Sequence, residues 1–326
     1  MSTNASRPLK LGTRGSTLAM AQSGQVAERV RRLTGRPVEL VGITTYGDVS
    51  REHLSRIGGT GVFVSALRDA LLAGEVDFAV HSLKDLPTAQ PPQLALAAVP
   101  VREDPRDALI ARDGLTFEQL PDGARVGTGS PRRMAQLNAW ARALGRRIET
   151  VPIRGNIERR LGFVRSGELD AVVLATAGLR RADMADAITE LIDPSAVLPA
   201  PGQGALAIEC VASNEDLTTQ LAELDDPRTR AAVTAERSLL SALEAGCSAP
   251  VGALADVRDE GQDVTELHLR GVVGTTDGTT LVQLSTTGSV PASAAESLAR
   301  AQALGRELAD EMLAKGAAGL MGERAH

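Results

Sequence analysis

Apolar and polar positions repeat along the chain in an order that predicts two similar α/β halves. In the first half, an apolar stretch at 9–11 leads through a glycine turn at 12–16 into helix-like residues. The second half repeats this order at 124–126 and 127–130, and in both halves a serine precedes a methionine by four positions. Strand, glycine turn and helix in succession indicate a βα architecture, for which we expect a mostly parallel sheet.

A second repeated pattern supports the same interpretation. Helical spacing at 65–73 and at 156–166 is followed in both places by a glycine, which is a common helix C-cap. The sequences GEVD at 74–77 and GELD at 167–170 come next, and each precedes an apolar run. We therefore expect each half to contain a second helix, a turn and a buried strand.

The rest of the chain has a different texture. A stiff, turn-rich segment at 198–204 is interpreted as the return hinge to the first half, and an amphipathic helix is predicted over 230–245. After residue 250, strand-like stretches at 265–273 and 280–286 are separated by Gly/Asp turns, and a long helix is predicted over 292–315. These features predict a small α+β domain with a short antiparallel sheet and one covering helix.

Length and composition fit this division. A chain of 326 residues is long enough for two or three domains. With 43% hydrophobic and 23% charged residues, wholesale disorder and collagen-like repeats are excluded, and 2% aromatic residues predict an aliphatic core. We expect three domains: lobe 1 at 8–104 and 204–224, lobe 2 at 105–203, and a C-terminal α+β domain at 225–326.

Other sequence features bear on compartment and cofactors. No apolar run approaches the ~20 residues of a membrane span, and the polar start at 1–8 lacks a secretory pattern. Two cysteines, Cys210 and Cys247, cannot build a disulfide scaffold and supply no CxxC pair for zinc. We expect a soluble, cytoplasmic protein with no metal.

Arginine dominates the basic residues, 32 against three lysines. The planar guanidinium binds carboxylates and phosphates with two hydrogen bonds, although codon bias explains most surface arginines. An isoelectric point near 5.4 argues against nucleic-acid binding. The positions of particular arginines must therefore decide which of them bind a ligand.

Several of these arginines follow predicted strands or open predicted helices. Arg14 lies in the first glycine turn, and Arg132 with Arg133 follows the second. Further arginines occur at 153–160 and 180–181. Helix N-termini are themselves anion sites, so the pattern predicts a cleft for a ligand with several carboxylates or phosphates.

Two more positions attract attention. The apolar run at 78–80 ends in HSLKDLP, which places Lys84 and Asp85 where ligands bind in open α/β sheets, although a solvated loop is the alternative. Cys247 lies in a turn after the amphipathic helix, and an accessible thiol there could carry a covalent link. Cys210 ends an apolar strand and is expected to be structural.

Taken together, these motifs resemble the porphobilinogen deaminase (hydroxymethylbilane synthase) family across the whole chain. The matching stretches are GTRGS (12–16), YGD (46–48), GGTGVF (58–63), DFAVHSLKDLP (77–87), REDPRDA (102–108), VGTGSPRR (126–133), IRGNIERRL (153–161), LATAGLRR (174–181), LPAPGQGALAIEC (198–210) and LEAGCSAPVG (243–252). The resemblance implies an α/β fold with two periplasmic-binding-protein-like lobes around a cleft. It also implies a small C-terminal α+β domain with a three-stranded antiparallel sheet and a helix.

The resemblance further implies a transferase of tetrapyrrole (haem) biosynthesis. Such an enzyme joins four porphobilinogen molecules head to tail into hydroxymethylbilane, releases four ammonia, and grows the product on a dipyrromethane cofactor covalently attached to Cys247. The implied catalytic residue is Asp85. The implied cofactor-binding residues, besides Cys247, are Ser82, Lys84, Thr128, Gly129, Ser130, Arg132, Arg133, Arg160 and Arg181. The implied substrate-binding residues are Arg14, Ser16, Arg154 and Gln203, with Asp48 and Phe63 in a mobile loop.

Departures from the family pattern and other functions remain open at this point. Tyr46 and Thr60 stand where many members have Arg and Lys, so two cations are absent from the loop. The main alternative is a non-catalytic two-lobed binding protein for small polycarboxylates, which would form no covalent adduct. An arginine-based RNA binder is disfavoured by the acidic isoelectric point. The expected partner is porphobilinogen, without nucleic acid or membrane, and the expected state is a monomer.

Overall fold

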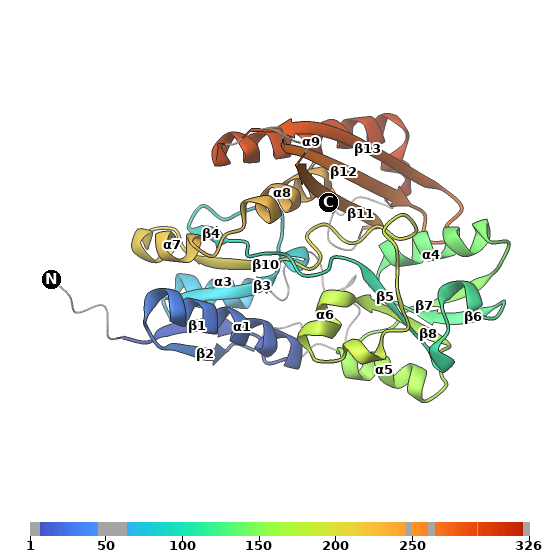
Figure 1. The fold of residues 1–326 in the computed structure, drawn as a ribbon, viewed down its shortest axis with the longest axis horizontal. Helices are drawn as coiled ribbons and strands as arrows, with labels where there is room; N and C mark the ends of the chain where they lie inside the picture. The colour runs from blue at the N-terminus through green and yellow to red at the C-terminus, as the bar shows by residue number, and fades with distance from the viewer. Residues whose placement is uncertain (1–6, 45–63, 246–248, 260–264, 292, 322–326) are drawn as a thin grey trace. The chain divides into compact units, whose positions relative to one another are not determined.

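The computed structural model describes residues 7–44, 64–245, 249–259, 265–291 and 293–321. The chain divides into two compact units, each built from two stretches of sequence. Unit 1 comprises Met1–Arg102 and Ala205–Arg230, and unit 2 comprises Glu103–Gly204 and Ala231–His326. Figure 1 labels the helices and strands of both units.

Unit 1 contains a five-stranded sheet in the order β2-β1-β3-β10-β4. Strand β1 pairs in parallel with β2 and β3, whereas β10 runs antiparallel to both β3 and β4. The strands are β1 (Leu9–Thr13), β2 (Val38–Gly42), β3 (Phe78–Ser82), β4 (Leu94–Ala98) and β10 (Leu206–Val211). The helices are α1 (Thr17–Thr34), α3 (Ser65–Leu72), the 3-10 turn η1 (Leu83–Asp85) and α7 (Glu215–Ala222).

Unit 2 repeats this arrangement in a sheet of order β7-β6-β8-β5-β9. Here too β6 pairs in parallel with β7 and β8, and β5 is antiparallel to β8 and β9. The strands are β5 (Asp107–Ala111), β6 (Ala124–Gly127), β7 (Ile148–Val151), β8 (Ala171–Ala175) and β9 (Glu190–Leu191). The helices are α4 (Pro131–Ala143), α5 (Ile157–Arg165) and α6 (Thr176–Arg181), with short 3-10 turns η2 (Arg112–Gly114), η3 (Phe117–Gln119) and η4 (Ala185–Ala187).

Alternating side chains bury both faces of each sheet. In unit 1, Phe78 of β3 packs with Val26 of α1, while its neighbour Ala79 packs with Leu67 of α3. In unit 2, Val173 of β8 packs with the α4 face, and the preceding residue packs with α5 and α6. Strands covered on both faces read as continuous apolar runs, which is why these two were recognisable in the sequence.

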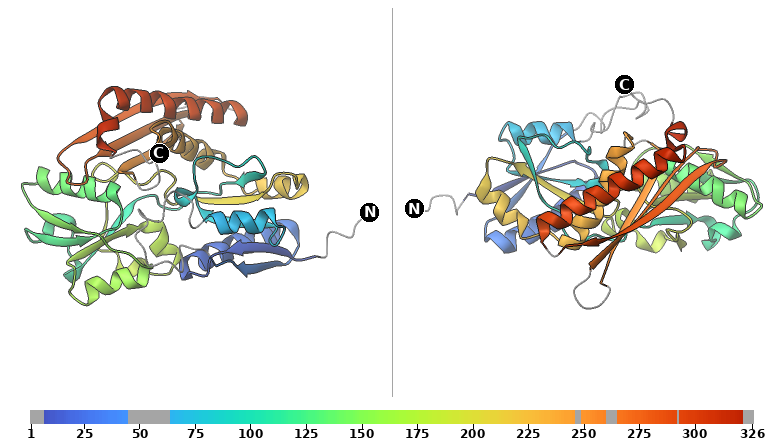
Figure 2. Two further views of the ribbon diagram at one scale, coloured as in Figure 1. Left: turned by 180° about the vertical axis from the view of Figure 1, so that it is seen from behind. Right: turned by 90° about the horizontal axis from the view of Figure 1, so that it is seen from above.

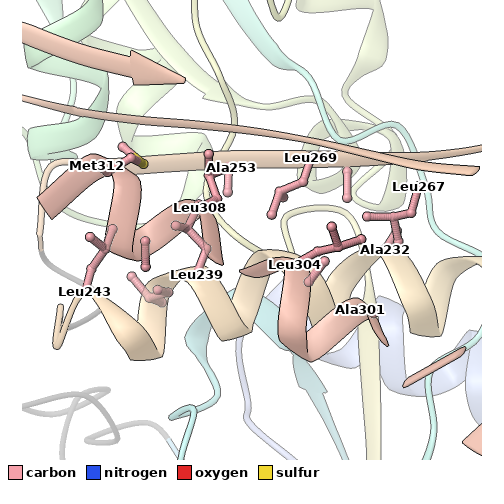
Figure 3. Close-up of a cluster of buried hydrophobic side chains, with 14 of the residues drawn as sticks. Ala232, Leu239, Leu243, Ala253, Leu267, Leu269, Ala301, Leu304, Leu308 and Met312 are labelled. Atoms are coloured by element: carbon pink, nitrogen blue, oxygen red, sulfur yellow. The ribbon is translucent and has the colours of Figure 1, made fainter. Parts of the chain in front are cut away.

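A third sheet lies in unit 2, with three antiparallel strands in the order β11-β12-β13. Its elements are β11 (Val251–Asp259), β12 (Thr265–Gly274), β13 (Leu281–Val290), α8 (Pro227–Ala242), α9 (Ala294–Ala314) and the 3-10 turn η5 (Ala317–Leu320). Helix α9 runs along the sheet in Figure 2. Leu239, Leu269, Leu304, Leu308 and Met312 form the buried cluster between the helices and the strands (Figure 3).

Most predictions of local structure are confirmed. Gly74 and Gly167 both adopt the left-handed conformation that ends a helix, at φ of 70° and 74°. The expectation of mostly parallel sheets is wrong, because β10 and β5 enter their sheets in the opposite direction, so each sheet has two parallel and two antiparallel pairings. The exact three-domain boundaries stay a prediction. Of the helices in the described ranges, none is both long and apolar enough to cross a membrane.

The segment at 198–204, interpreted as the return to the first half, is the last part of unit 2 before the chain enters unit 1 at Ala205. Leu198 donates its N–H to Gln136 Oε1 at 2.7 Å, and Gly202 donates its N–H to Glu236 Oε2 at 2.6 Å. Glu236 is itself completely buried and accepts a second bond from the Ala255 N–H at 2.9 Å. These bonds fix the segment within unit 2.

Candidate active site

Asp85 lies at the end of β3, in the short turn η1. Leu83 and Leu86 on either side of it are buried and anchor the turn, and the Leu83 N–H donates to the Ala205 carbonyl at 3.0 Å. The Asp85 side chain itself is exposed, and no described residue donates a hydrogen bond to its carboxylate. An exposed carboxylate on an anchored turn, without a hydrogen-bond donor in the described part of the chain, is suited to proton transfer or to stabilising a cation.

Other predicted residues of unit 1 surround the same strand ends. Ser16 caps helix α1 by accepting the Ala19 N–H at 3.3 Å. Ser82 forms a hydrogen bond with the buried Gln22 side chain at 3.2 Å. Arg14 and Lys84 are half-buried.

Behind this edge, unit 1 buries a charged cluster. Glu209 of β10 is fully buried and accepts two hydrogen bonds from Arg68 of α3, at 2.8 and 3.1 Å. His81 Nε2 lies 3.0 Å from Glu209 Oε2. Burial alone would raise the pKa of Glu209, but the His81 and Arg68 contacts outweigh it and lower that pKa to about 2.

Unit 2 buries a different cluster, centred on Asp107 at the start of β5. Arg132 Nη1 donates to Asp107 Oδ2 and Arg133 Nη2 donates to Asp107 Oδ1, both at 2.7 Å. Gln203 Nε2 donates to Asp107 Oδ1 at 2.8 Å. Burial would raise the Asp107 pKa, but the two guanidinium charges hold it well below its usual range.

Arg132 and Arg133 each have N–H groups that do not bind Asp107. Arg132 also binds the Leu198 carbonyl at 2.6 Å, and Arg133 binds the Val173 carbonyl at 2.9 Å. Their Nε atoms are buried and have no hydrogen-bond partner among the described residues. A buried N–H without an acceptor is costly, so these groups fit an anionic ligand.

Further cations lie close to this cluster. Burial, together with the charges of Arg133 and Arg154, lowers the pKa of Arg160 to about 10. Burial is the larger cause of this shift, and the two neighbouring guanidinium charges add to it. Arg181 lies on α6, where its Nη2 donates to the Gly204 carbonyl at 2.7 Å.

The glycine turn before α4 is tightly built. Thr128 is fully buried and its Oγ1 accepts the Ser130 N–H at 3.2 Å. A Cβ at Gly129 would come within 2.7 Å of the Ile153 carbonyl oxygen. No acidic residue occupies the first turn of α4, so the helix dipole adds to the positive field.

These residues fit a dipyrromethane with its carboxylate side chains. Two arginines share one carboxylate, two buried Nε–H groups lack acceptors among the described residues, and burial together with neighbouring like charge lowers the pKa of a third arginine. Among the described residues no cluster of His, Cys, Asp and Glu could hold a metal ion. Cys247, Asp48 and Phe63, with Tyr46 and Thr60, lie outside the described residues.

Sequence reasoning missed Asp107 and Glu209. Each is a carboxylate within an otherwise apolar strand, in DALIA and LAIECV. Buried carboxylates are rare unless they are paired, so an acid inside a buried strand was a usable signal.

Comparisons with known proteins agree with the motifs. The family model described as "Porphobilinogen deaminase, dipyromethane cofactor binding domain" matches residues 9–219, and "Porphobilinogen deaminase, C-terminal domain" matches residues 230–314. Porphobilinogen deaminase 1 of Streptomyces avermitilis is 76% identical over 323 residues, covering 98% of each chain. Porphobilinogen deaminase of Thermobifida fusca is 58% identical over 313 residues, covering 95% of this chain and 94% of that one.

Among solved structures, a periplasmic substrate-binding protein from Coxiella burnetii matches 68% of this chain and 93% of its own, with a TM-score of 0.42 and 12% identity. The family assignment rests instead on the two models, which together span most of the sequence, and on the relatives that match nearly end to end. The chain belongs to the porphobilinogen deaminase family.

Proposed function

We propose that the protein joins four porphobilinogen molecules head to tail into hydroxymethylbilane on a dipyrromethane attached to Cys247, with release of four ammonia and uptake of one water, which frees the product from the dipyrromethane and supplies its hydroxyl group. The observation that carries the proposal is the match of both family domains, the first of which is described as a cofactor-binding domain. Each addition forms one C–C bond at a pyrrole carbon and breaks the C–N bond of the incoming aminomethyl group, whose nitrogen leaves as ammonia. The attacked pyrrole carbon then loses its proton. The dipyrromethane, when bound, supplies the pyrrole carbon to which the first substrate is joined.

Asp85 is the proposed catalytic residue. Loss of ammonia leaves positive charge on the substrate pyrrole, and a carboxylate beside the ring nitrogen stabilises it. Its carboxylate is exposed and sits on a turn anchored by the buried Leu83 and Leu86. The same oxygen atoms can accept and return the proton that the condensation releases.

The arginines of unit 2 have a separate proposed role. Each pyrrole ring carries one acetate and one propionate, so the bound material gains two negative charges with every addition. Arg132 and Arg133 supply buried guanidinium groups whose two charges Asp107 only partly balances, and the half-buried Arg160 adds a third charge. Arg154, Arg181, Lys84, Thr128 and Ser130 are proposed to bind further carboxylates or ring nitrogens. Arg14, Ser16 and Gln203 are proposed to hold the incoming substrate.

The decisive experiment is the intact mass of the purified chain. The expected mass exceeds that of the sequence by one dipyrromethane, and the Cys247→Ala variant is expected to lack the adduct and all turnover. Incubation of the wild-type protein with porphobilinogen should add masses in steps of one substrate minus ammonia. Reversible binding of porphobilinogen without an adduct would contradict the proposal and indicate a binding protein.

We also propose that the enzyme works as a cytoplasmic monomer, without nucleic acid or membrane. Light scattering of the purified protein in the presence of porphobilinogen tests the monomeric state, because a mass near 34.0 kDa is expected.

A further inference from the structure

The two five-stranded sheets can be compared position by position. In unit 1, Gly12 of β1 is opposite Ala79 of β3, and Ser82, three residues further along β3, is opposite Leu206. In unit 2, Gly127 of β6 is opposite Val172 of β8, and Ala175, again three residues further along, is opposite Asp107. Leu206 and Asp107 therefore occupy the same position in two copies of one fold.

The helices that follow the glycine turns align in the same way. The sequence Met-Ala-Gln ends at Gln22 in α1 and at Gln136 in α4, and both glutamines are buried. Counting back from these glutamines, Arg132 and Arg133 correspond to Leu18 and Ala19. Where unit 2 has Arg132, Arg133 and Asp107, unit 1 thus has Leu18, Ala19 and Leu206.

This comparison shows which residues at these positions are required for folding. Apolar residues close the fold at these positions in unit 1, so unit 2 does not require charges there for its sheet to pack. Burying charges costs desolvation, which apolar residues avoid. The cluster of Asp107, Arg132 and Arg133 is therefore not explained by folding.

We propose that Asp107 is a positioning residue, which holds the guanidinium groups of Arg132 and Arg133 in the orientation that binds the cofactor carboxylates. The inference rests on the proposed function. Asp107 is fully buried, and each of its oxygen atoms receives one arginine at 2.7 Å. It neutralises one of the two guanidinium charges, and it leaves both buried Nε–H groups without an acceptor among the described residues.

The test measures how strongly the cofactor stabilises the folded chain. The midpoint of thermal unfolding is compared between apo-protein, made in a host that lacks porphobilinogen, and the same protein after loading with porphobilinogen. The attached cofactor interacts with the arginines only in the folded state, so loading should raise the wild-type midpoint. In Asp107→Asn this gain is expected to fall by at least half, and adduct formation, followed by intact mass, is expected to slow at least tenfold. Asp107→Glu, which keeps the charge, should recover part of both.

A control variant accounts for general loss of stability. Leu137→Ala removes a fully buried side chain from the apolar face of the same helix without touching the arginines. It should lower the apo and loaded midpoints equally and leave the adduct rate unchanged. If Asp107→Asn behaves like Leu137→Ala, Asp107 is merely structural and the inference is overturned.

A second comparison applies if Asp107→Asn does not fold. The variant Arg132→Leu/Arg133→Ala/Asp107→Leu copies the residues of unit 1 and is compared with Arg132→Leu/Arg133→Ala. Because Asp107 acts through the arginines, both variants should form adduct at the same reduced rate. A further fivefold loss in the triple variant would overturn the inference. A wild-type chain without adduct would contradict the proposed function itself, whereas an adduct with unchanged gain in Asp107→Asn contradicts this inference alone.

Discussion

The buried carboxylates of the two units lie on corresponding strands but have different surroundings. Glu209 of β10 in unit 1 receives both nitrogens of one arginine, a histidine within 3.0 Å and the amide of Gln90 at 3.1 Å. Asp107 of β5 in unit 2 receives one nitrogen from each of two arginines. In the first cluster one arginine faces one carboxylate, whereas in the second two arginines share one carboxylate, so the second retains positive charge.

The difference between the two clusters indicates that the charges around Glu209 serve the fold and that those around Asp107 serve a ligand. An ion pair such as that of Arg68 and Glu209 stabilises the fold only if both partners are present, because removal of one leaves an uncompensated charge in the protein interior. The Asp107 cluster has a surplus of cations that the protein alone does not satisfy, which fits a chain of carboxylates. Asp85, the proposed catalytic carboxylate, belongs to neither cluster and is exposed on its turn.

The largest expected effect tests this separation at Asp85. In Asp85→Asn the turnover number is expected to fall at least a hundredfold, in line with removal of one electrostatic contributor to a transition state. The thermal midpoint should be unchanged, because the carboxylate has no described hydrogen-bond donor to lose. Steady-state kinetics and calorimetry on the same sample measure both. The exposed Asp216 of α7 provides the control, since Asp216→Asn should alter neither, and near-normal turnover in Asp85→Asn would remove it from the mechanism.

Glu209→Gln is expected to have the largest effect on stability. It leaves Arg68 buried without its carboxylate, and breaking a buried ion pair costs about 3–5 kcal/mol. Denaturant unfolding measures the loss. Protein that remains folded should carry the cofactor at the wild-type level, because this cluster does not bind it. A loss of adduct from the folded fraction would mean that the unit 1 cluster also serves the ligand.

The same variant should change the response to acid. The folded-state pKa of Glu209 is lowered from 4.5 to about 2, so its stabilisation is fully present above pH 4.5 and is lost as the pH falls towards 2. A shift of this size corresponds to on the order of 3 kcal/mol at ~1.4 kcal/mol per pH unit. Unfolding free energies between pH 5 and 2.5 should therefore fall less steeply in Glu209→Gln than in the wild type. Parallel slopes would show that the carboxylate is not held ionised.

Arg160→Gln tests the surplus of positive charge in unit 2, with a smaller expected effect than the two variants above. Removing this charge relieves repulsion with Arg133 and Arg154, so the apo-protein should be as stable as the wild type or slightly more so. Elongation is expected to slow about tenfold and to stall at a particular product length, visible as discrete masses. Arg160→Lys, which keeps the charge but not the planar fork, should lie between the two. An unchanged distribution of intermediates would exclude Arg160 from carboxylate binding.

The sequence made the elements near the site predictable, but not their charged partners. Helices and turns follow from local signals, such as the glycines at 74 and 167 and the Ser16 cap. The antiparallel strands were not predictable, because pairing direction depends on where the chain returns and not on local periodicity. Asp107 and Glu209 were missed for the same reason. Their arginine partners lie 25 and 26 residues away for the first and 141 residues away for the second.

The smallest expected effect concerns the second thiol, Cys210 of β10. It is fully buried in the unit 1 core, with Sγ 3.2 Å from Thr218 Oγ1, and burial raises its pKa. A buried protonated thiol does not act as a nucleophile, so the cofactor is not expected there. Cys210→Ala should keep full cofactor loading and lose only about 1 kcal/mol of stability, the transfer free energy of a small apolar group.

Labelling of the loaded wild type with a thiol reagent should give no product until the chain is unfolded, since Cys247 is blocked and Cys210 is buried. An adduct mapped to the peptide containing Cys210 would reverse the assignment of the two sulfurs.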